Sequence, residues 1–318
     1  MDSGKQLLGL QQKGITLIEV MVAMLIGLFI LVAVSQVLIN SGRIRNEVES
    51  TGRQLENGAF ALNLLRDELN NAGFWGESGA QEDSVAGAPP LCPGTLDELN
   101  HAMANPVQGT AAGSTSCETG KGGGASLAIR RASSCALNSP DCQAVNQAYF
   151  YIQVPACAAD ANIGAAVLKR GTADLTALNL KCDAAILAPI YRYLSRIYYL
   201  TSNDELVRME LGTDGYSSSG ALVDGVEGLH FSYGLDTDGD AQVDEFNDAP
   251  TPAQWPDVIA VRIWLIARNL EATPGYTDTN SYSLGGLTYE PAAYKNHKRQ
   301  IYSTTVFLKN VGGPREVQ

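Results

Sequence analysis

Residues 15–39 form an apolar run in which Glu19 is the only ionisable residue. As an α-helix, its 25 residues would extend about 37 Å, enough to cross a hydrocarbon core of ~30 Å. A charge near the middle of a lipid-facing helix costs roughly 2.5–3.5 kcal/mol, and a charge near the end costs less. The run therefore predicts a membrane-spanning helix whose carboxylate still needs a partner.

The residues before and after the start of this run form a compact pattern. A short leader with Lys5 and Lys13 ends at Gly14, and the sequence ITLIE follows from Ile15 to Glu19. A secretory signal peptide fits less well, because its apolar region has about 7–15 residues and its small-residue cleavage site comes afterwards. An ordinary signal anchor that happens to contain a glutamate is the remaining alternative.

This pattern resembles the processing site of type IV prepilins, although that family usually has Phe where this chain has Ile15. The resemblance implies cleavage between Gly14 and Ile15 by the prepilin peptidase, N-methylation of Ile15 and packing of the helix in a filament core. Cleavage would create a positive amino group four residues from Glu19. In a filament, Glu19 could neutralise the amine of a neighbouring subunit, since an unpaired charge in an apolar core is costly.

Helical periodicity continues beyond the apolar run with a single apolar stripe. The stripe consists of Ile44, Val48, Leu55, Ala59, Leu62, Leu65, Leu69 and Ala72. One helix is therefore expected from Ile15 to about Asn71, with Gly73 at its C-cap. Four glycines interrupt it, either as points of bending or as points of close packing. They are Gly27, Gly42, Gly52 and Gly58.

The segment from Phe74 to Gly124 has little periodicity and is rich in Gly, Ala, Ser and Pro. It predicts a long loop excursion, either a binding surface or a tolerated insertion. Strand patterns dominate the rest of the chain. The expected strands are 126–130, 148–154, 165–169, 190–200, 205–211, 226–233, 258–267 and 301–308.

An antiparallel sheet with one covered face can pack on the amphipathic half of the helix. The expected class is therefore α+β and pilin-like. Its expected domains are a leader (1–14), a long helix (15–73, with 15–39 in the membrane or filament core) and a disulfide-containing β-rich domain (74–318) with a loop excursion over 74–124.

The chain has 318 residues and a net charge of −12, which disfavours binding of nucleic acid through its phosphates. Its six cysteines show no C-x-x-C spacing, so disulfides in an oxidising periplasm fit better than zinc. Sequential pairing closes the shortest loops, and buried free thiols are the alternative. The expected pairs are Cys92–Cys117, Cys135–Cys142 and Cys157–Cys182.

An acidic segment between two expected strands is the candidate metal site. Its possible ligands are Asp236, Asp238, Asp240, Gln242, Asp244 and Glu245. Oxygen ligands at alternating positions suit calcium. The segment departs from an EF-hand loop at Ala241 and Asn247, where that loop has Gly and Glu, so a short calcium turn is the hypothesis and a solvated acidic turn is the alternative.

The C-terminal half carries a second resemblance. The sequences GVEGLHFSYGLDTDGD, WPDVIAVRIWLIARN and YSTTVFLKN resemble those of PilW-type minor pilins. The resemblance implies a low-abundance subunit that helps to start or cap a type IV pilus near its tip and supports twitching motility and adhesion. Implied partners are the major pilin, minor pilins of the PilV and PilX type and a large tip-associated adhesin.

Two alternatives stay open, a J-type pseudopilin of type II secretion and a calcium-dependent tip adhesion module. No catalytic constellation is visible around the three histidines, so an enzyme is not expected. The expected location is the inner membrane, with the body in the periplasm, and then the extracellular pilus.

Overall fold

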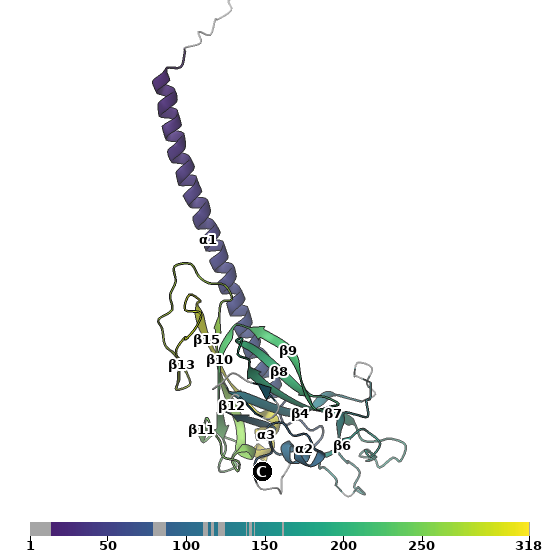
Figure 1. Cartoon of the computed structure of the whole chain (residues 1–318). Helices are drawn as coiled ribbons and strands as arrows, with labels where there is room; N and C mark the ends of the chain where they lie inside the picture. Colours follow the sequence, from purple (N-terminus) through teal and green to yellow (C-terminus); the bar gives the residue numbers. More distant parts are fainter. Residues whose placement is uncertain are drawn as a thin grey trace, which may run out of the picture. The chain divides into compact units, whose positions relative to one another are not determined.

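The computed structural model describes residues 14–78, 87–110, 114–115, 118–119, 125–137, 139, 142, 144–160 and 162–317. The chain divides into two units, Met1–Thr51 and Gly52–Gln318. The boundary falls within helix α1 (Leu17–Asn70), which is continuous across it (Figure 1). The predicted long helix is thus confirmed, and its start and end lie within two residues of the expected ones.

In the first unit, the described chain is almost entirely α1. The helix is long and apolar enough to cross a membrane by length and composition. Its large apolar side chains are exposed along the whole run, from Leu17 to Ile39.

The second unit consists of the rest of α1, two short α-helices, two 3-10 helices and the strands. The helices are α2 (Leu96–Met103), α3 (Lys309–Gly312), η1 (Trp255–Asp257) and η2 (Gly313–Val317). The strands are β1 (Val107–Thr110), β2 (Ser114–Thr115), β3 (Glu118–Thr119), β4 (Ser126–Ala136), β5 (Phe150–Gln153), β6 (Val167–Arg170), β7 (Ile190–Leu200), β8 (Glu205–Leu211), β9 (Tyr216–Asp224), β10 (Val226–Leu235), β11 (Glu245–Asn247), β12 (Val258–Arg268), β13 (Tyr282–Leu284), β14 (Leu287–Tyr289) and β15 (Arg299–Phe307).

All the described strand pairs are antiparallel, and they form two main sheets. The larger sheet has the order β1-β4-β7-β5-β6, and β8 and β9 extend it from the second half of β7. Strand β7 therefore pairs with β5 near Ile190 and with β8 near Leu200, on the same edge. The smaller sheet has the order β11-β10-β12-β15. Strands β13–β14 and β2–β3 form separate hairpins.

The main core lies between the last turns of α1 and both sheets (Figure 1). Leu65 and Leu69 of α1 are fully buried against Tyr198 of β7 and Ile263 of β12. The predicted α+β architecture, a long N-terminal helix packed on antiparallel β structure, is confirmed, with two main sheets where one was expected.

The buried face of α1 differs in part from the expected stripe. Leu55 is exposed, whereas Gln54 and Gly58 are buried. The Gln54 side-chain amide donates to the carbonyl oxygens of Ala267 and Lys298, at 2.8 and 3.1 Å. Neither residue has an apolar side chain, because glutamine ends in a polar amide and glycine has no side chain. Hydrophobic periodicity therefore could not assign them to this face.

The expected loop excursion over 74–124 is wrong for much of its described part. It contains α2 and β1, and β1 pairs with β4. A capping box between Thr95 and Glu98 starts α2 and compensates for its short length. Trp75 is also buried and stacks on Tyr193 with a centroid separation of 5.9 Å.

Candidate functional site

The first candidate site is the start of α1, where the expected processing residues lie. A Cβ added at Gly14 would meet no other group within 4 Å, and Ile15 is 77% exposed. Both residues are therefore uncovered by the rest of the described chain. The helix itself begins only at Leu17, so the peptide bond between Gly14 and Ile15 lies ahead of regular structure.

Thr16 and Glu19 form a reciprocal cap at this end. The backbone N–H and the hydroxyl of Thr16 each donate to Oε2 of Glu19, at 2.9 Å. The Glu19 N–H approaches the Thr16 hydroxyl oxygen at 3.4 Å. A capping box satisfies N–H groups that a helix start leaves without partners. Glu19 therefore has a structural role within the chain, in addition to the pairing with a neighbouring amine that the sequence suggests.

The second candidate site is the acidic turn after β10. Carboxylate oxygens of Asp236, Asp238 and Asp244 all lie within 4.8 Å of one another and could hold a metal ion. The other three expected ligands lie outside this triad. Asp240 accepts hydrogen bonds from the backbone and side chain of Gln242 at 2.8 and 2.9 Å, and Glu245 is exposed at the start of β11.

Hydrogen-bond donors of the protein itself already contact carboxylates of the triad. Asp236 is buried and accepts from the N–H groups of Gly239 and Ala241, at 2.8 and 3.2 Å. The Arg315 guanidinium lies 2.9 Å from the Asp236 carboxylate and supplies one positive charge. Hydrogen bonds from the side chain and backbone of Thr237 hold the pKa of Asp244 below its ordinary value. The turn is therefore ordered by its own hydrogen bonds. A cation would bind beside Arg315, which already neutralises one of the three carboxylates.

Two disulfides lie in the larger sheet and its loops. They are Cys135–Cys142 and Cys157–Cys182, with Cα–Cα distances of 5.9 and 4.9 Å. Both belong to the sequential pairing. Cys117 of the remaining expected pair, Cys92–Cys117, lies outside the described residues.

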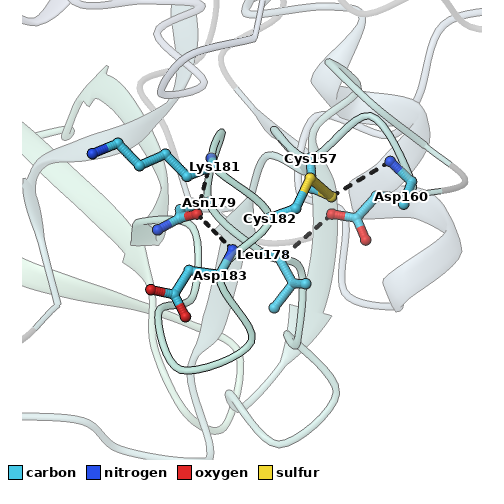
Figure 2. Close-up of a disulfide and its surroundings, with 8 residues drawn as sticks. Cys157, Asp160, Leu178, Asn179, Lys181, Cys182 and Asp183 are labelled. Carbon is cyan, nitrogen blue, oxygen red and sulfur yellow. Dashed lines mark hydrogen bonds between the residues drawn. A yellow bond between two sulfur atoms is a disulfide. The ribbon is translucent and has the colours of Figure 1, made fainter.

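Figure 2 shows that the Cys157–Cys182 bond joins two loops, which are also linked by the hydrogen bond between Leu178 and Asp160. The Asp160 carboxylate accepts from the N–H of Leu178 at 3.2 Å, and the Asn179 side chain accepts from the N–H groups of Lys181 and Asp183. The disulfide therefore fastens two loops outside the named strands, one of which also contains an isolated antiparallel β-bridge between Leu178 and Leu187.

The comparisons with known proteins match both ends of the chain. Residues 10–35 match the model of the prokaryotic N-terminal methylation motif. Residues 197–310, which run from β7 through β15, match the model of Type IV Pilus-assembly protein W.

A type IV-like pilin from Thermus thermophilus is similar in structure, with a TM-score of 0.39 and 12% identity. The similarity covers 81% of this chain and 98% of that one. No curated protein matches the chain. The chain therefore carries a prokaryotic N-terminal methylation motif joined to the region of Type IV Pilus-assembly protein W.

Proposed function

We propose that this protein is a minor pilin of the PilW type that helps to initiate or cap a type IV pilus near its tip. The observation that carries the proposal is the combination of two parts in one chain. An exposed apolar helix carries Glu19 at its start, and the body continues into the PilW-type region. An exposed helix of this kind requires a bilayer or other apolar helices around it.

The assembly pathway follows from this combination. The prepilin peptidase cleaves after Gly14 and the new N-terminus at Ile15 is methylated. The helix then leaves the inner membrane and packs with the helices of the major pilin and of other minor pilins, of the PilV and PilX type. The body, exported to the periplasm, meets these subunits and the large tip-associated adhesin. Such a protein is a structural subunit with no catalytic role.

Gene deletion with complementation tests the pilus assignment. Loss of the protein should sharply reduce surface pili and twitching motility and leave exoprotein secretion intact. If piliation survives and secretion fails, the protein is instead a J-type pseudopilin. Normal pilus number with loss of surface attachment would favour the tip adhesion module.

Processing has its own test. Mass spectrometry of the mature chain should find a methylated Ile15 at the N-terminus, and a Gly14→Glu variant should retain the 14-residue leader. An intact leader in the wild-type chain would contradict the prepilin assignment.

The acidic turn supports calcium as a second proposal, because calcium accepts carboxylate oxygens from residues spaced as in this turn. Calorimetry of the full chain in detergent should show saturable heat with calcium, and Asp238→Asn should abolish it. Asp214→Asn, in the turn between β8 and β9, is the matched control. An unchanged melting temperature with chelator, together with the absence of calcium heat, would contradict this proposal.

A further inference from the structure

A cavity of about 420 Å³ lies on the larger sheet, and its described lining includes no residue of the processing segment or of the acidic turn. Its floor is formed by neighbouring strands β4, β7 and β8. The disulfide-bonded Cys135 and Cys142 also line it, as do Tyr149 and Tyr151. The cavity is thus built from paired strands and a cross-linked segment, which favours a preformed binding site.

The cavity is rich in positive charge. Arg192, Arg196 and Arg208 line it together with a single carboxylate, that of Glu210. Three guanidinium groups against one carboxylate give a formal charge of +2 among the described lining residues. Next to them, Glu68 of α1 pairs with Arg131 and Arg196, which adds one charge of each sign and leaves this excess unchanged. The excess stands out because the chain as a whole carries −12.

The three arginines differ in how many ion pairs they already make. Arg196 makes two close ones, since its Nε lies 2.8 Å from Glu210 and an Nη bonds to Glu68. Arg192 reaches the other oxygen of Glu210 at 3.3 Å. Arg208 is the least engaged in ion pairs, because its Nε lies 4.0 Å from Glu210. That Nε is buried and has no hydrogen-bond partner among the described residues. The Arg208 side chain as a whole is 26% exposed, so an anionic acceptor that entered the cavity would reach its guanidinium and offset the charge excess.

The walls fit a group with both an anionic head and an apolar stem. The Arg192 guanidinium carbon lies 3.8 Å from the centre of the Tyr149 ring, which holds the planar group in place. Leu137 and Leu194 supply apolar surface beside the arginines. A guanidinium fork binds a planar carboxylate through two parallel N–H bonds, and Glu210 already shows that a carboxylate fits between Arg192 and Arg196.

We propose that this cavity binds a carboxylate from outside the chain, with Arg208 as its main contact and Arg192 as a second. The carboxylate belongs either to an acidic side chain of an inserted peptide segment or to a small free carboxylic acid. The site is independent of the processing motif, so its failure would leave the pilin assignment untouched.

Calorimetry on the full-length protein in zwitterionic detergent at low salt tests the proposal. The titrants are N-acetyl-glutamate N-methylamide, which mimics a peptide side chain, and acetate and sulfate. Saturable binding of the glutamate mimic is expected, and Arg208→Gln should weaken it by about tenfold or more, since one charge-assisted hydrogen bond is worth at least that factor. Tighter binding of the mimic than of acetate identifies a peptide ligand, and equal binding identifies a free carboxylate.

Arg262→Gln is the matched control, because it removes one positive charge from the smaller sheet, where Arg262 stacks over Phe246. It should leave binding unchanged. If Arg208→Gln lowers the melting temperature, Arg208→Lys is the second variant. It keeps the positive charge but lacks the planar guanidinium that binds a carboxylate through two hydrogen bonds, so it should still weaken binding. Absence of saturable carboxylate binding would overturn the proposal, as would binding of sulfate alone or equal loss in the Arg262 control.

Discussion

At the residue scale, the local hydrogen bonds of Glu19 leave room for the intermolecular role that we propose for it. Both hydrogen bonds from Thr16 go to Oε2, and Oε1 has no hydrogen bond within the described residues. The cap can therefore remain while Oε1 faces the amine of a neighbouring subunit. This arrangement explains how a carboxylate can be held in position at the start of an apolar helix before its partner arrives.

Replacing Glu19 with Ala should prevent incorporation into filaments without unfolding the body, because the second unit contains no described contact that depends on this side chain. Sheared pili are probed for the variant by immunoblotting, and body stability is followed by urea unfolding. Ser35→Ala is the control, since the Ser35 hydroxyl is satisfied inside the same helix by the Leu31 carbonyl at 2.7 Å. Equal incorporation of the Glu19 and Ser35 variants would rule out charge pairing.

Asp278 gives a second residue-scale prediction, on pH. Burial opposes ionisation of its carboxyl, but hydrogen bonds from Tyr282 and Asn280 and the charge of Arg299 hold its pKa below the ordinary value. Burial and the bond to Asp278 raise the pKa of Tyr282 to about 12, so its hydroxyl remains a donor. Because the folded pKa is the lower one, this stabilisation is complete above the unfolded pKa of ~3.9 and is lost as pH falls through the folded pKa.

Tyr282→Phe should therefore lower the free energy of unfolding by about 2 kcal/mol at neutral pH, the range for a hydrogen bond to a charged group. The deficit should shrink once the pH falls below ~4. Urea unfolding across this range measures it. Tyr276→Phe, in the loop before β13, is the control and should change little, because the Tyr276 ring lies under the Lys298 ammonium. A deficit that stayed constant with pH would show that Asp278 is not its source.

At the element scale, two glycines of α1 have opposite consequences. A Cβ at Gly58 would overlap the ring of Tyr302 on β15, whereas a Cβ at Gly52 would meet nothing within 4 Å. Gly52→Ala should stabilise the protein by up to about 1 kcal/mol through helix propensity. Gly58→Ala should destabilise it by about 1–3 kcal/mol through overpacking. Thermal unfolding of both variants distinguishes these effects, and a stabilised Gly58→Ala protein would mean that α1 does not press on β15 there.

The helices and strands also show which elements could be predicted from sequence patterns. Strands β7 and β12 were predictable because they are long and rich in Tyr, Ile and Val. Strand β9 was not, because its Ser-Ser-Ser-Gly run is exposed and shows no alternation. Helix α2 had a readable signal in Thr95 and Glu98, but its eight residues are too few for clear periodicity.

In the candidate sites too, sequence reasoning finds residues that are close together along the chain and misses those that only folding brings together. The processing segment is continuous in sequence, so its residues could all be named in advance. In the acidic turn, local spacing found Asp236, Asp238 and Asp244, but Arg315 comes from the C-terminal end of the chain and no local pattern relates it to Asp236. Arg192 and Arg196 share a face of a predicted strand, yet the approach of Arg208 and Glu68 depends on pairing and packing.

At the scale of the whole molecule, the charge distribution and the disulfides agree with the proposed export of the body. The expected leader contains Asp2, Lys5 and Lys13 and so has a charge of +1, whereas the chain totals −12. Positive charge before a membrane helix favours its cytoplasmic side. The two described disulfides lie in the second unit, and disulfides as a class form and persist mainly in oxidising compartments.

Thiol labelling in cells should therefore report where the body lies. In cells denatured under a non-reducing condition, a maleimide dye should label the wild-type cysteines only after reduction. Val22→Lys/Ile26→Lys places two charges in the apolar run, each costing roughly 2.5–3.5 kcal/mol near mid-bilayer, so this variant should stay in the cytoplasm and label without reduction. Leu55→Lys/Phe60→Lys, at exposed positions of α1 beyond the run, is the control and should behave as wild type. Wild-type thiols that label before reduction would place the body in the reducing compartment and exclude the export route on which pilus assembly depends.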